Sequence, residues 1–574
     1  MTCVRASLAF VVGMVAAILP NVVRTEPVPW VTTSTVRICR GTGFPTRPMQ
    51  EVNLAAARNE WVSFQVFVRS DRPLRGVAID LSSLKSDGGE IDSDAVRVYR
   101  EYQLELKEPT YRNDAFQPDW YPDPLIPQKH PFTGETLSKA RFVALPFDLP
   151  ANETHGFWVD VFVSRDKSPA IYRGTVRVVS QEGEIAAMPV NLEVWDFTLP
   201  RFPALVTALG SPAARMRDYY AKRAKAGIEA EPTDWAAVER QCALLAREHR
   251  INAYPPADWF QLERKGDSFE LPAERIQQLR NWIDTYNVNA IQVPSPVGIV
   301  KDPQENRQVL QAWARAWDQA IGAINRPHVV YFIYLKDEPN DPEAYEFVRL
   351  WGKAIRETKT KVKVMVVEQT LTQNPDWGDL YGAVDIWCSL FPLYDEPTAR
   401  KRQELGEIMW AYTALCQAKK TPWWHIDYPL LHYRLPCWMS YRYDIKGLLY
   451  WGGMSHWSQV EDPWVDPRTY RPGRSDRPLI YNGEGTLVYP ARPCGYDGIV
   501  PSLRLKALRD GIEDFDYFAI LQQAGRGDQA LEIVRRLTPS WFAWDPEPEA
   551  YEQARRELAS LILGLPNDVR NPTW

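Results

Sequence analysis

The chain has 574 residues, a formal net charge of −6 and 24% charged residues. This length is sufficient for two or more domains, each with its own core. The near balance of charge, without a long acidic or basic run, argues against nucleic acid as a partner. The clearest bias in composition is 23 Trp and 26 Tyr, and aromatic rings at strand ends are typical of sugar-binding sites.

The first 25 residues are typical of a secretory signal. Arg5 precedes an apolar run from Ala6 to Leu19, and Pro20 ends that run. The run is shorter than a membrane-spanning helix, and no later stretch is long and apolar enough to span a membrane. We therefore expect export, to the periplasm, the cell surface or the medium, with segment 1–25 as the only membrane contact. An uncleaved anchor is the alternative, because no clear small-residue cleavage site follows.

Residues 26–198 alternate between apolar and polar side chains. The segment WVSFQVFVRS, from Trp61 to Ser70, has a period of two, and later segments repeat it between Gly, Pro, Asn and Asp residues. Several short strands with turn signals between them predict an N-terminal β-sandwich. The proline-rich segment from Asp114 to Pro131 has no regular period, and we expect a long loop at a domain interface. This domain groups no acid, base or nucleophile, so a scaffold or a carbohydrate-binding module is expected. We favour a scaffold, because the connection VWDFTLPRFP to the next domain leaves no flexible Gly/Ser linker.

In residues 199–574, candidate strands alternate with amphipathic helical segments. This pattern predicts a (β/α)8 barrel of the TIM type with C-terminal helices, and with its site where the carboxyl ends of the strands meet. A doubly wound open sheet is the alternative, but the turn LGSPAAR after the first strand lacks a glycine-rich phosphate motif. The predicted strands are 204–209, 252–254, 290–293, 329–335, 363–367, 384–389, 422–426 and 447–451, and the predicted helices include 401–417 and 502–524.

Two adjacent carboxylates follow the fourth predicted strand. In YFIYLKDEPN, residues 331–340, strand-forming side chains give way to Asp337 and Glu338, and a proline then ends the strand. Adjacent residues at a strand end point to different sides, so the two carboxylates could perform two tasks. The alternative is that they only stabilise the start of the next helix. Asp341 with Pro342 is the better cap for that helix, and we favour a catalytic role for the pair.

Other acids and aromatic residues are expected near the same rim of the barrel. Each of them alone could be an ordinary core or turn residue, but their convergence indicates a sugar-binding site. The cysteines and histidines do not have the spacing of metal ligands, so no metal and no cofactor is expected. The end of the barrel at which Arg250 lies is left open. The predicted substrate-binding residues are Arg250, Glu368, Trp387, Trp424, Asp427, Tyr428, Trp451, Trp457 and Glu484.

Several segments together resemble glycoside hydrolase family 123 and the uncharacterised proteins that share its catalytic domain. They are LAAARNEWVSFQVFV, YPDPLIP, the strand-end DEP, and NGEGTLVYP followed by SLRLKALRDGIEDFDYF. The resemblance covers nearly all of the chain after the signal, and it implies a β-sandwich followed by a (β/α)8 barrel. It also implies retaining exo-hydrolysis of β-linked N-acetylgalactosamine with assistance from the substrate. Carried over to this chain, Asp337 would orient the 2-acetamido group and Glu338 would be the general acid and base.

Two other functions are compatible with the same residues. A two-carboxylate retaining glycosidase could use Glu338 as acid/base and Asp427 as nucleophile on another sugar. A secreted protein could also bind glycan without cutting it, because a fold does not fix an activity. Intact carboxylates at positions 337 and 338 favour an enzyme. We therefore predict an exported glycoside hydrolase whose partner is a glycan or glycoconjugate.

Overall fold

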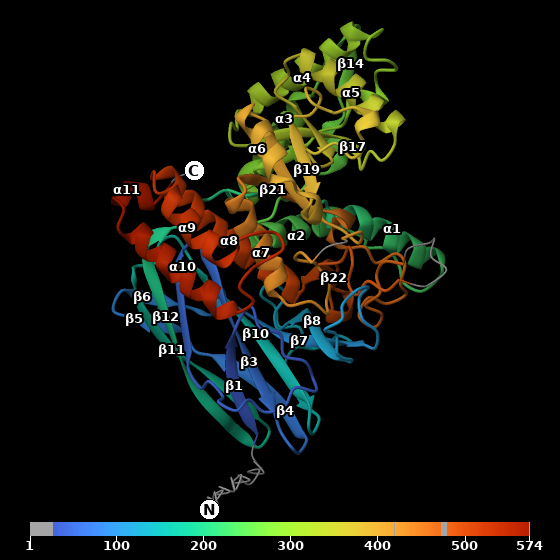
Figure 1. The fold of residues 1–574 in the computed structure, drawn as a ribbon. Coiled ribbons are helices and arrows are strands. Elements are labelled where there is room, and N and C mark those ends of the chain that lie inside the picture. The colour runs from blue at the N-terminus through green and yellow to red at the C-terminus, as the bar shows by residue number, and fades with distance from the viewer. Residues whose placement is uncertain (1–26, 418–419, 472–478, 573–574) are drawn as a thin grey trace, which may run out of the picture.

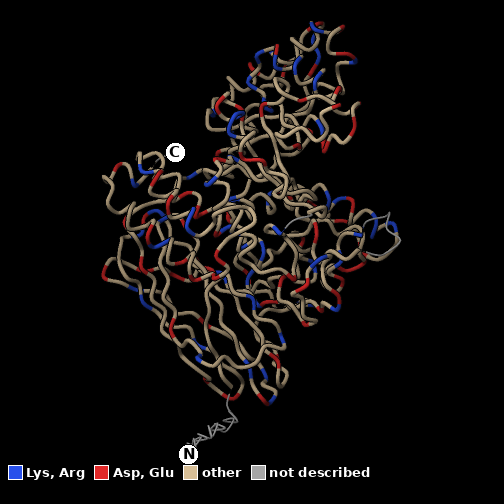
Figure 2. The backbone as a smooth tube through the Cα atoms, in the orientation of Figure 1, with Lys and Arg blue, Asp and Glu red and all other residues tan. Residues whose placement is uncertain are grey.

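The structure is a computed structural model that describes residues 27–417, 420–471 and 479–572. It combines a β-rich unit with an α/β unit built around a parallel sheet (Figure 1). Basic and acidic residues are interspersed along both units (Figure 2). No helix within these ranges is long and apolar enough to cross a membrane. The predicted signal segment, 1–25, lies outside the described residues.

The β-rich unit consists of two sheets that share one apolar core. Val66 and Val159 of the first sheet lie in the same buried cluster as Val178 and Leu192 of the second. The period of two in the sequence produces this arrangement, because alternate side chains point to the inner face. The first sheet has the order β1 (Val28–Thr33), β3 (Glu60–Arg69), β10 (Thr154–Val163), β7 (Val96–Leu106) and β8 (Asp119–Pro127). The second has the order β2 (Val52–Arg58), β12 (Gly183–Thr198), β11 (Ala170–Ser180), β4 (Leu74–Leu81) and β9 (Phe147–Leu149), with β5 (Leu84–Ser86) and β6 (Gly89–Ile91) beside β11.

The α/β unit contains a nearly closed parallel sheet of seven strands. Its inner face encloses a separate apolar core that includes Met365, Cys388 and Trp410. The order is β13 (Val206–Ala208), β21 (Ile445–Tyr450), β20 (Ile408–Thr413), β19 (Ile386–Leu390), β18 (Lys363–Val367), β17 (Val330–Asp337) and β16 (Ala290–Gln292). Two small hairpins are formed by β14 (Glu263–Lys265) with β15 (Ser268–Glu270) and by β22 (Val488–Pro490) with β23 (Ile499–Pro501).

Helices pack around the parallel sheet, and the C-terminal helices lie against the β-rich unit (Figure 1). Their amphipathic faces meet the outer side of the strands in one extended core. The helices are α1 (Pro212–Lys225), α2 (Trp235–Glu248), α3 (Ala273–Tyr286), α4 (Arg307–Ile324), α5 (Pro342–Glu357), α6 (Glu396–Glu404), α7 (Leu431–Arg442), α8 (Leu503–Gln523), α9 (Gly527–Leu537), α10 (Pro548–Leu563) and α11 (Asn567–Arg570).

Three local predictions were wrong. Segments 252–254 and 422–426 were predicted as strands, but both are irregular. Segment 401–417 was predicted as one helix, but α6 ends at Glu404 and the chain then forms β20. The run IMWAYT of β20 is apolar and short, and such a run cannot be assigned to helix or strand from periodicity alone. The prediction thus assigned 422–426 as the seventh strand, whereas Ile408–Thr413 forms the strand in that part of the chain.

Asn252 bridges the two edge strands of the parallel sheet, β13 and β16, at the position where a second strand was predicted. Its backbone N–H donates to Thr207 Oγ1 and its side-chain amide donates to the Thr207 carbonyl, each at 2.9 Å. On the other side, its Oδ1 accepts the N–H of Asn289 at 2.9 Å. A single buried side chain therefore connects β13 to the start of β16.

We expect Asn252→Ala to lower the free energy of unfolding by about 2 kcal/mol or more, because it leaves buried backbone groups of Thr207 and Asn289 without partners. Chemical denaturation measures this change. Gln319→Ala, at an exposed position of α4, is the control and should change stability by less than about 0.5 kcal/mol. Equal stability of the two variants would contradict the bridging role of Asn252.

Part of the predicted loop 114–131 is the strand β8, which pairs antiparallel with β7. The prolines of YPDPLIP concealed this strand, because proline cannot donate a ladder hydrogen bond. β8 lies at the edge of its sheet, where proline is tolerated. Its Asp123 accepts two hydrogen bonds from Arg504 of α8, each at 2.9 Å. The segment therefore contributes to the contact between the two units as a strand and not as a loop.

Helix α8 joins the two units through buried ion pairs. The sequence predicted an amphipathic helix over 502–524, but every residue from Leu503 to Phe518 is buried. Lys506 and Arg509 donate to Asp160 of β10 at 2.6 Å and 2.9 Å, and Asp514 pairs with Arg434 of α7. Buried charges are costly unless they are paired. The pairs with Asp160 therefore fix the position of the β-rich unit relative to α8, and the pair with Arg434 ties α8 to α7.

Candidate active site

Asp337 and Glu338 lie at the carboxyl end of β17, where the strand has a register shift. The pairing with β18 shifts between Tyr334 and Lys336. Tyr334 faces the inner core of the sheet, whereas the Lys336 ammonium lies over the ring of Phe347 in α5. After the shift, the side chain of Asp337 lies on the same face of the sheet as Tyr334 and accepts a hydrogen bond from the Tyr334 hydroxyl. The shift therefore turns Asp337 toward the mouth of the sheet, as bulges next to active sites commonly do.

Glu338 leaves the strand in an uncommon backbone conformation. Its φ angle is 36°, in the left-handed region that residues other than glycine rarely adopt. The side chains of Asp337 and Glu338 are both exposed, so packing of these side chains does not explain the conformation. Such an outlier at a strand end is a reason to consider a functional role.

Two tyrosines hold the two carboxylates separately. Tyr334 of β17 donates to Asp337 Oδ1 at 2.7 Å, and Tyr412 of β20 donates to Glu338 Oε1 at 2.6 Å. Burial, together with the adjacent carboxylate, raises the pKa of each phenol far above its usual value. Both phenols therefore remain protonated donors. Each carboxylate is oriented by its own tyrosine.

A third carboxyl group, Glu368, follows β18 next to the pair. Glu368 is buried and accepts hydrogen bonds from the N–H of Gln369 at 3.0 Å and from Nε2 of Gln373 at 2.7 Å. Burial raises the pKa of Glu368 to about 7, with a smaller contribution from the Glu338 carboxylate. The structure thus brings Glu368 together with Asp337 and Glu338 at one end of the parallel sheet.

Glu368 should make the stability of the protein depend on pH. Its pKa of about 7 in the folded state lies above the value of about 4.3 expected in the unfolded chain. The folded state therefore holds this proton more tightly, and its stability falls as pH rises from about 4 to about 7, by an amount on the order of 2–3 kcal/mol. Gln resembles the protonated acid and does not titrate. We therefore expect the stability of Glu368→Gln to lack this part of the fall with rising pH.

Denaturation at about pH 5 and about pH 8 checks this expectation, since the two conditions fall on opposite sides of the raised pKa. The control is Glu343→Gln at an exposed position of α5, which should keep the pH dependence of the original protein. A Glu368→Gln variant with that same pH dependence would rule out the buried acid as its source.

A second group lies at the carboxyl end of β21, around Trp451. The indole N–H of Trp451 donates to Oε1 of Glu484, and the ring packs edge-on against Tyr470 at 4.9 Å. Burial raises the pKa of Glu484 to about 7. Cys416 lies within the electrostatic reach of both groups. Burial raises the pKa of its thiol to about 11, and the negative charges of Glu338 and, to a smaller extent, Glu484 add to this rise. Trp451 and Glu484 therefore lie on the same side of the sheet as the carboxylate pair.

Three predicted platform tryptophans are core residues. Trp387, Trp424 and Trp457 are each at most 1% exposed. Their indole N–H groups donate to Oε2 of Glu407 at 2.6 Å, to the carbonyl of His432 at 3.0 Å and to the carbonyl of Val488 at 3.0 Å, respectively. A ring without an exposed face cannot stack on a sugar, so we remove these three from the candidate site.

Asp427 belongs to the contact between the two units, and Tyr428 packs within the α/β unit. Thr110 of the β-rich unit donates its N–H and its hydroxyl to the two carboxylate oxygens of Asp427, at 2.7 Å and 2.6 Å. Tyr428, which is half-buried, packs against the ring of Trp423. Both oxygens of Asp427 are thus engaged in holding the β-rich unit, which argues against a role as nucleophile.

Arg250 lies at the opposite end of the sheet from Asp337. Its guanidinium pairs with Asp516 of α8 at 2.6 Å and donates to the carbonyl of Pro200 at 2.9 Å. Asp516 also accepts the N–H of Ala204, just before β13 begins. Because the strands are parallel, the start of β13 is remote from the carboxyl end of β17. Arg250 is therefore not part of this candidate site.

A cavity of about 860 Å³ opens beside Tyr334. Gly210, Tyr254, Ser295 and Met454 contribute to its walls, and its size is within the range of small-molecule sites. No group of three or more His, Cys, Asp or Glu residues in the described part of the chain could hold a metal ion. The arrangement therefore offers carboxylates and phenols next to a cavity large enough for a sugar ring.

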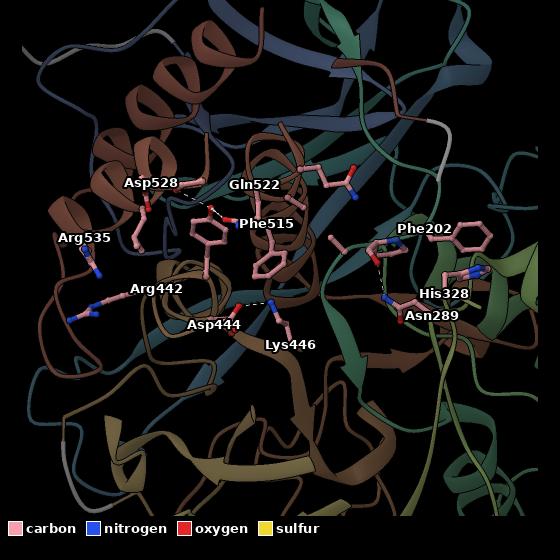
Figure 3. Close-up of a pocket in the computed structure, with 18 of the residues that line it drawn as sticks. Phe202, Asn289, His328, Arg442, Asp444, Lys446, Phe515, Gln522, Asp528 and Arg535 are labelled. Atoms are coloured by element: carbon pink, nitrogen blue, oxygen red, sulfur yellow. Dashed lines mark hydrogen bonds and ion pairs between the residues drawn. The ribbon is translucent and has the colours of Figure 1, made fainter. Parts of the chain in front are cut away.

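A different pocket, of about 560 Å³, lies at the amino ends of the strands (Figure 3). Phe202, Asn289 and His328 line one part of it, and Phe515 and Arg535 line another. Neither Asp337 nor Glu338 lines either pocket, but Tyr334, the partner of Asp337, lines the 860 Å³ cavity and not this one. Sites in α/β folds lie at the carboxyl ends of the strands, and we do not assign the catalytic function to this pocket.

The sequence pattern did not reveal Tyr334 and Tyr412. Tyr334 lies in the predicted strand, but without the register shift it would not share a face with Asp337. Tyr412 lies in the segment predicted as a helix, where its position at a strand end could not be recognised. The aromatic and apolar run IMWAYT is the signal that could have identified β20.

Two family models match the chain. Residues 247–521 match the model described as "Glycoside hydrolase 123, catalytic domain", and residues 40–180 match the model of the "Glycoside hydrolase 123 N-terminal domain". The two matched regions follow the order of the two structural units. No curated protein matches the chain.

Among solved structures, the chain is similar to a family 123 glycoside hydrolase from Clostridium perfringens. The TM-score is 0.62 at 14% identity, over 94% of this chain and 97% of that one, which indicates a shared fold. A β-glucuronidase from Ruminococcus gnavus has a TM-score of 0.27 at 12% identity, over 79% of this chain and 65% of that one. A family 39 glycoside hydrolase from Bacteroides cellulosilyticus WH2 has a TM-score of 0.30 at 9% identity, over 76% and 80%. The TM-scores of these last two structures are too low to support an argument.

Proposed function

The chain belongs to glycoside hydrolase family 123, and we propose that it removes terminal β-linked N-acetylhexosamine, of the N-acetylgalactosamine type, from glycans. The observation that carries this proposal is the adjacent Asp337 and Glu338 pair with a different tyrosine on each carboxylate. Glycolipid glycan hydrolysis is attributed to the similar Clostridium enzyme. We therefore propose a glycoconjugate, such as a glycolipid, as the substrate.

In the first step, Glu338 protonates the glycosidic oxygen while the carbonyl oxygen of the substrate's own 2-acetamido group attacks C1. The bond between C1 and the glycosidic oxygen breaks, the alcohol leaves, and a bicyclic oxazolinium forms. Asp337 accepts the acetamide N–H and stabilises the positive charge that develops on the ring. Substrate-assisted glycosidases are an exception to the rule of two facing carboxylates, which fits an adjacent pair.

In the second step, the Glu338 carboxylate removes a proton from water, and the water attacks C1 from the side that the alcohol left. The oxazolinium ring opens, the acetamide is restored and the configuration at C1 is retained. Tyr334 and Tyr412 each occupy one oxygen of their carboxylate. The other oxygen of Asp337 and of Glu338 makes no hydrogen bond within the described residues and is available to the substrate.

The two-carboxylate alternative requires Asp427 as a nucleophile. Thr110 engages both oxygens of Asp427, and Asn113 adds a further hydrogen bond at 3.0 Å. A nucleophilic carboxylate needs an oxygen that can reach the sugar carbon. The contacts of Asp427 therefore favour the substrate-assisted mechanism.

We also propose the finer description of the fold. The shared core of the two antiparallel sheets supports a β-sandwich in residues 26–198. The seven parallel strands, with Asn252 between β13 and β16, support a (β/α)8-type barrel in residues 199–574 that lacks one regular strand. The site at the carboxyl ends of the strands is consistent with that architecture.

Export is a further proposal, based on Arg5 and the apolar run from Ala6 to Leu19. The expected result is that the protein recovered from its native host outside the cytoplasm starts after about Pro20, because a signal peptidase removes the segment. N-terminal sequencing measures this start. A protein that retains Met1 and stays with the cytoplasmic fraction would contradict export.

A panel of chromogenic monosaccharide glycosides tests the activity. We expect release of the chromophore from β-N-acetylgalactosaminide, and much slower release from the β-galactoside that lacks the acetamido group, because that group supplies the nucleophile. Equal rates on the two sugars would contradict the substrate-assisted mechanism. Inactivity on the whole panel, with the fold intact, would overturn the proposed substrate.

A further inference from the structure

A hollow of about 810 Å³ lies between the β-rich unit and the amino ends of the parallel strands. Its position is opposite to the carboxylate pair, so it is independent of the proposed glycosidase site. Asn59, Trp61 and Phe162 contribute walls from the β-rich unit. The remaining lining includes four acids and five arginines, which are Arg97, Arg165, Arg201, Arg247 and Arg250.

Three of these arginines, Arg165, Arg201 and Arg247, donate hydrogen bonds to uncharged oxygen atoms. Arg165 donates to the carbonyl of Leu199 at 3.0 Å, and Arg247 donates to the carbonyl of Thr285 at 3.2 Å. Arg201 donates to Oδ1 of Asn287 at 3.1 Å and to a backbone carbonyl. None of the three has an ion pair within the described residues. Carbonyl and amide oxygens fix a guanidinium without cancelling its charge, so the hollow keeps an excess of positive charge.

The acids around the hollow do not neutralise this charge. Asp284 is paired with Arg326, and the carboxylate of Glu248 is 3.8 Å from Arg97. Burial raises the pKa of Glu513, which disfavours the charged form of this carboxyl. Asp94, at the edge of the hollow, is exposed to solvent.

The floor of the hollow contains buried polar atoms without partners. Nε of Arg250 and Oε2 of Glu513 are both buried, and neither has a hydrogen-bond partner in the described part of the chain. Arg250 is 7% exposed and Glu513 is fully buried. The guanidinium N–H of Arg250 is a donor, and an unpaired buried donor is costly. The floor therefore lacks an acceptor that a bound ligand could supply.

We propose that this hollow binds an oxyanion group, a sulfate or phosphate, either free or as an ester on a saccharide. Arginines bind such groups through paired N–H donors. Arg165 and Arg201 supply charge at the rim, and Arg250 supplies an N–H without a partner at the floor. The aromatic pair Trp61 and Phe162, with ring centroids 5.0 Å apart, offers an apolar wall for the body of an ester ligand.

The test is isothermal titration calorimetry of the full chain at constant ionic strength set with chloride. The probes are inorganic sulfate, inorganic phosphate, and N-acetylgalactosamine with and without a sulfate ester. We expect saturable binding of the anions, and affinity that falls as chloride rises. Tighter binding of the sulfated than of the plain sugar identifies a saccharide ester as the source. Equal binding of the two sugars, with sulfate itself bound, identifies the free anion.

Arg165→Gln and Arg201→Gln should each weaken sulfate binding by about tenfold or more, because each removes a charged hydrogen bond to the anion. Both side chains are exposed, so the variants are expected to fold, which their melting temperatures verify. Arg315→Gln, at an exposed position of α4, is the matched control and should bind as the original protein does. No saturable binding by the original protein, or unchanged binding by both rim variants, would overturn the proposal without affecting the glycosidase assignment.

Discussion

Replacement of Glu338 by Gln is expected to lower kcat on an unactivated β-N-acetylhexosaminide by about 10²–10⁴-fold, the contribution typical of a general acid. An amide cannot give a proton to the glycosidic oxygen, and it cannot take one from water in the second step. The fold should be unchanged, because Tyr412 can donate to the Gln oxygen as it does to Oε1 of Glu338. Steady-state kinetics on a defined oligosaccharide measures the loss.

The leaving group separates acid catalysis from other effects of this substitution. A substrate with a dinitrophenolate leaving group needs no proton for the first step, so Glu338→Gln should form the oxazolinium at a nearly unchanged rate. Glu343→Gln, an exposed acid on α5, should behave like the original enzyme on both substrates. If Glu338→Gln lost the same factor on both substrates, the role of general acid would pass to another group, with Glu368 as the nearest candidate.

The sequence was sufficient to locate the carboxylate pair because two local signals coincide there. Strand-forming residues run up to Lys336, and Pro339 then prevents continuation of the ladder. Parallel strands place such an end at the rim where ligands bind. These signals depend only on near neighbours in the chain, and the structure has β17 ending at Asp337.

The partners of the pair could not be predicted, because they depend on a register shift and on distant strands. The shift between Tyr334 and Lys336 changes which side chains share a face, and alternation alone cannot show a shift. Tyr412 reaches Glu338 from a strand 74 residues later in the chain. Contacts of that kind are set by tertiary packing and not by local pattern.

Aromatic content was a poor guide to which rings are exposed at the rim of the sheet. Trp387, Trp424 and Trp457 were chosen from their places near strand ends, but each ring faces the core and each indole N–H has an internal acceptor. Large aromatic side chains are most often buried in cores of this size. Among the predicted tryptophans, only Trp451 combines partial exposure with a bond to a carboxylate of the rim.

Asp337→Asn is expected to lower kcat by about 10²–10³-fold, the effect of removing one electrostatic contact to the transition state. A neutral amide cannot stabilise the positive charge of the oxazolinium, although Tyr334 can still donate to its oxygen as it does to Oδ1 of Asp337. Asp427→Asn is the comparison. Its carboxylate holds Thr110 of the β-rich unit, so that variant should lose stability and keep most of its kcat.

The order of these two variants and the nature of the intermediate distinguish the two glycosidase mechanisms. A thiazoline analogue of the oxazoline should inhibit strongly, because it resembles the charged intermediate, and Asp337→Asn should weaken that inhibition as well as kcat. With a slow fluorinated substrate that traps covalent intermediates, mass spectrometry should find no sugar attached to the protein. A glycosylated peptide that contains Asp427 would mean that Thr110 releases this carboxylate during the reaction, and the substrate-assisted mechanism would then be wrong.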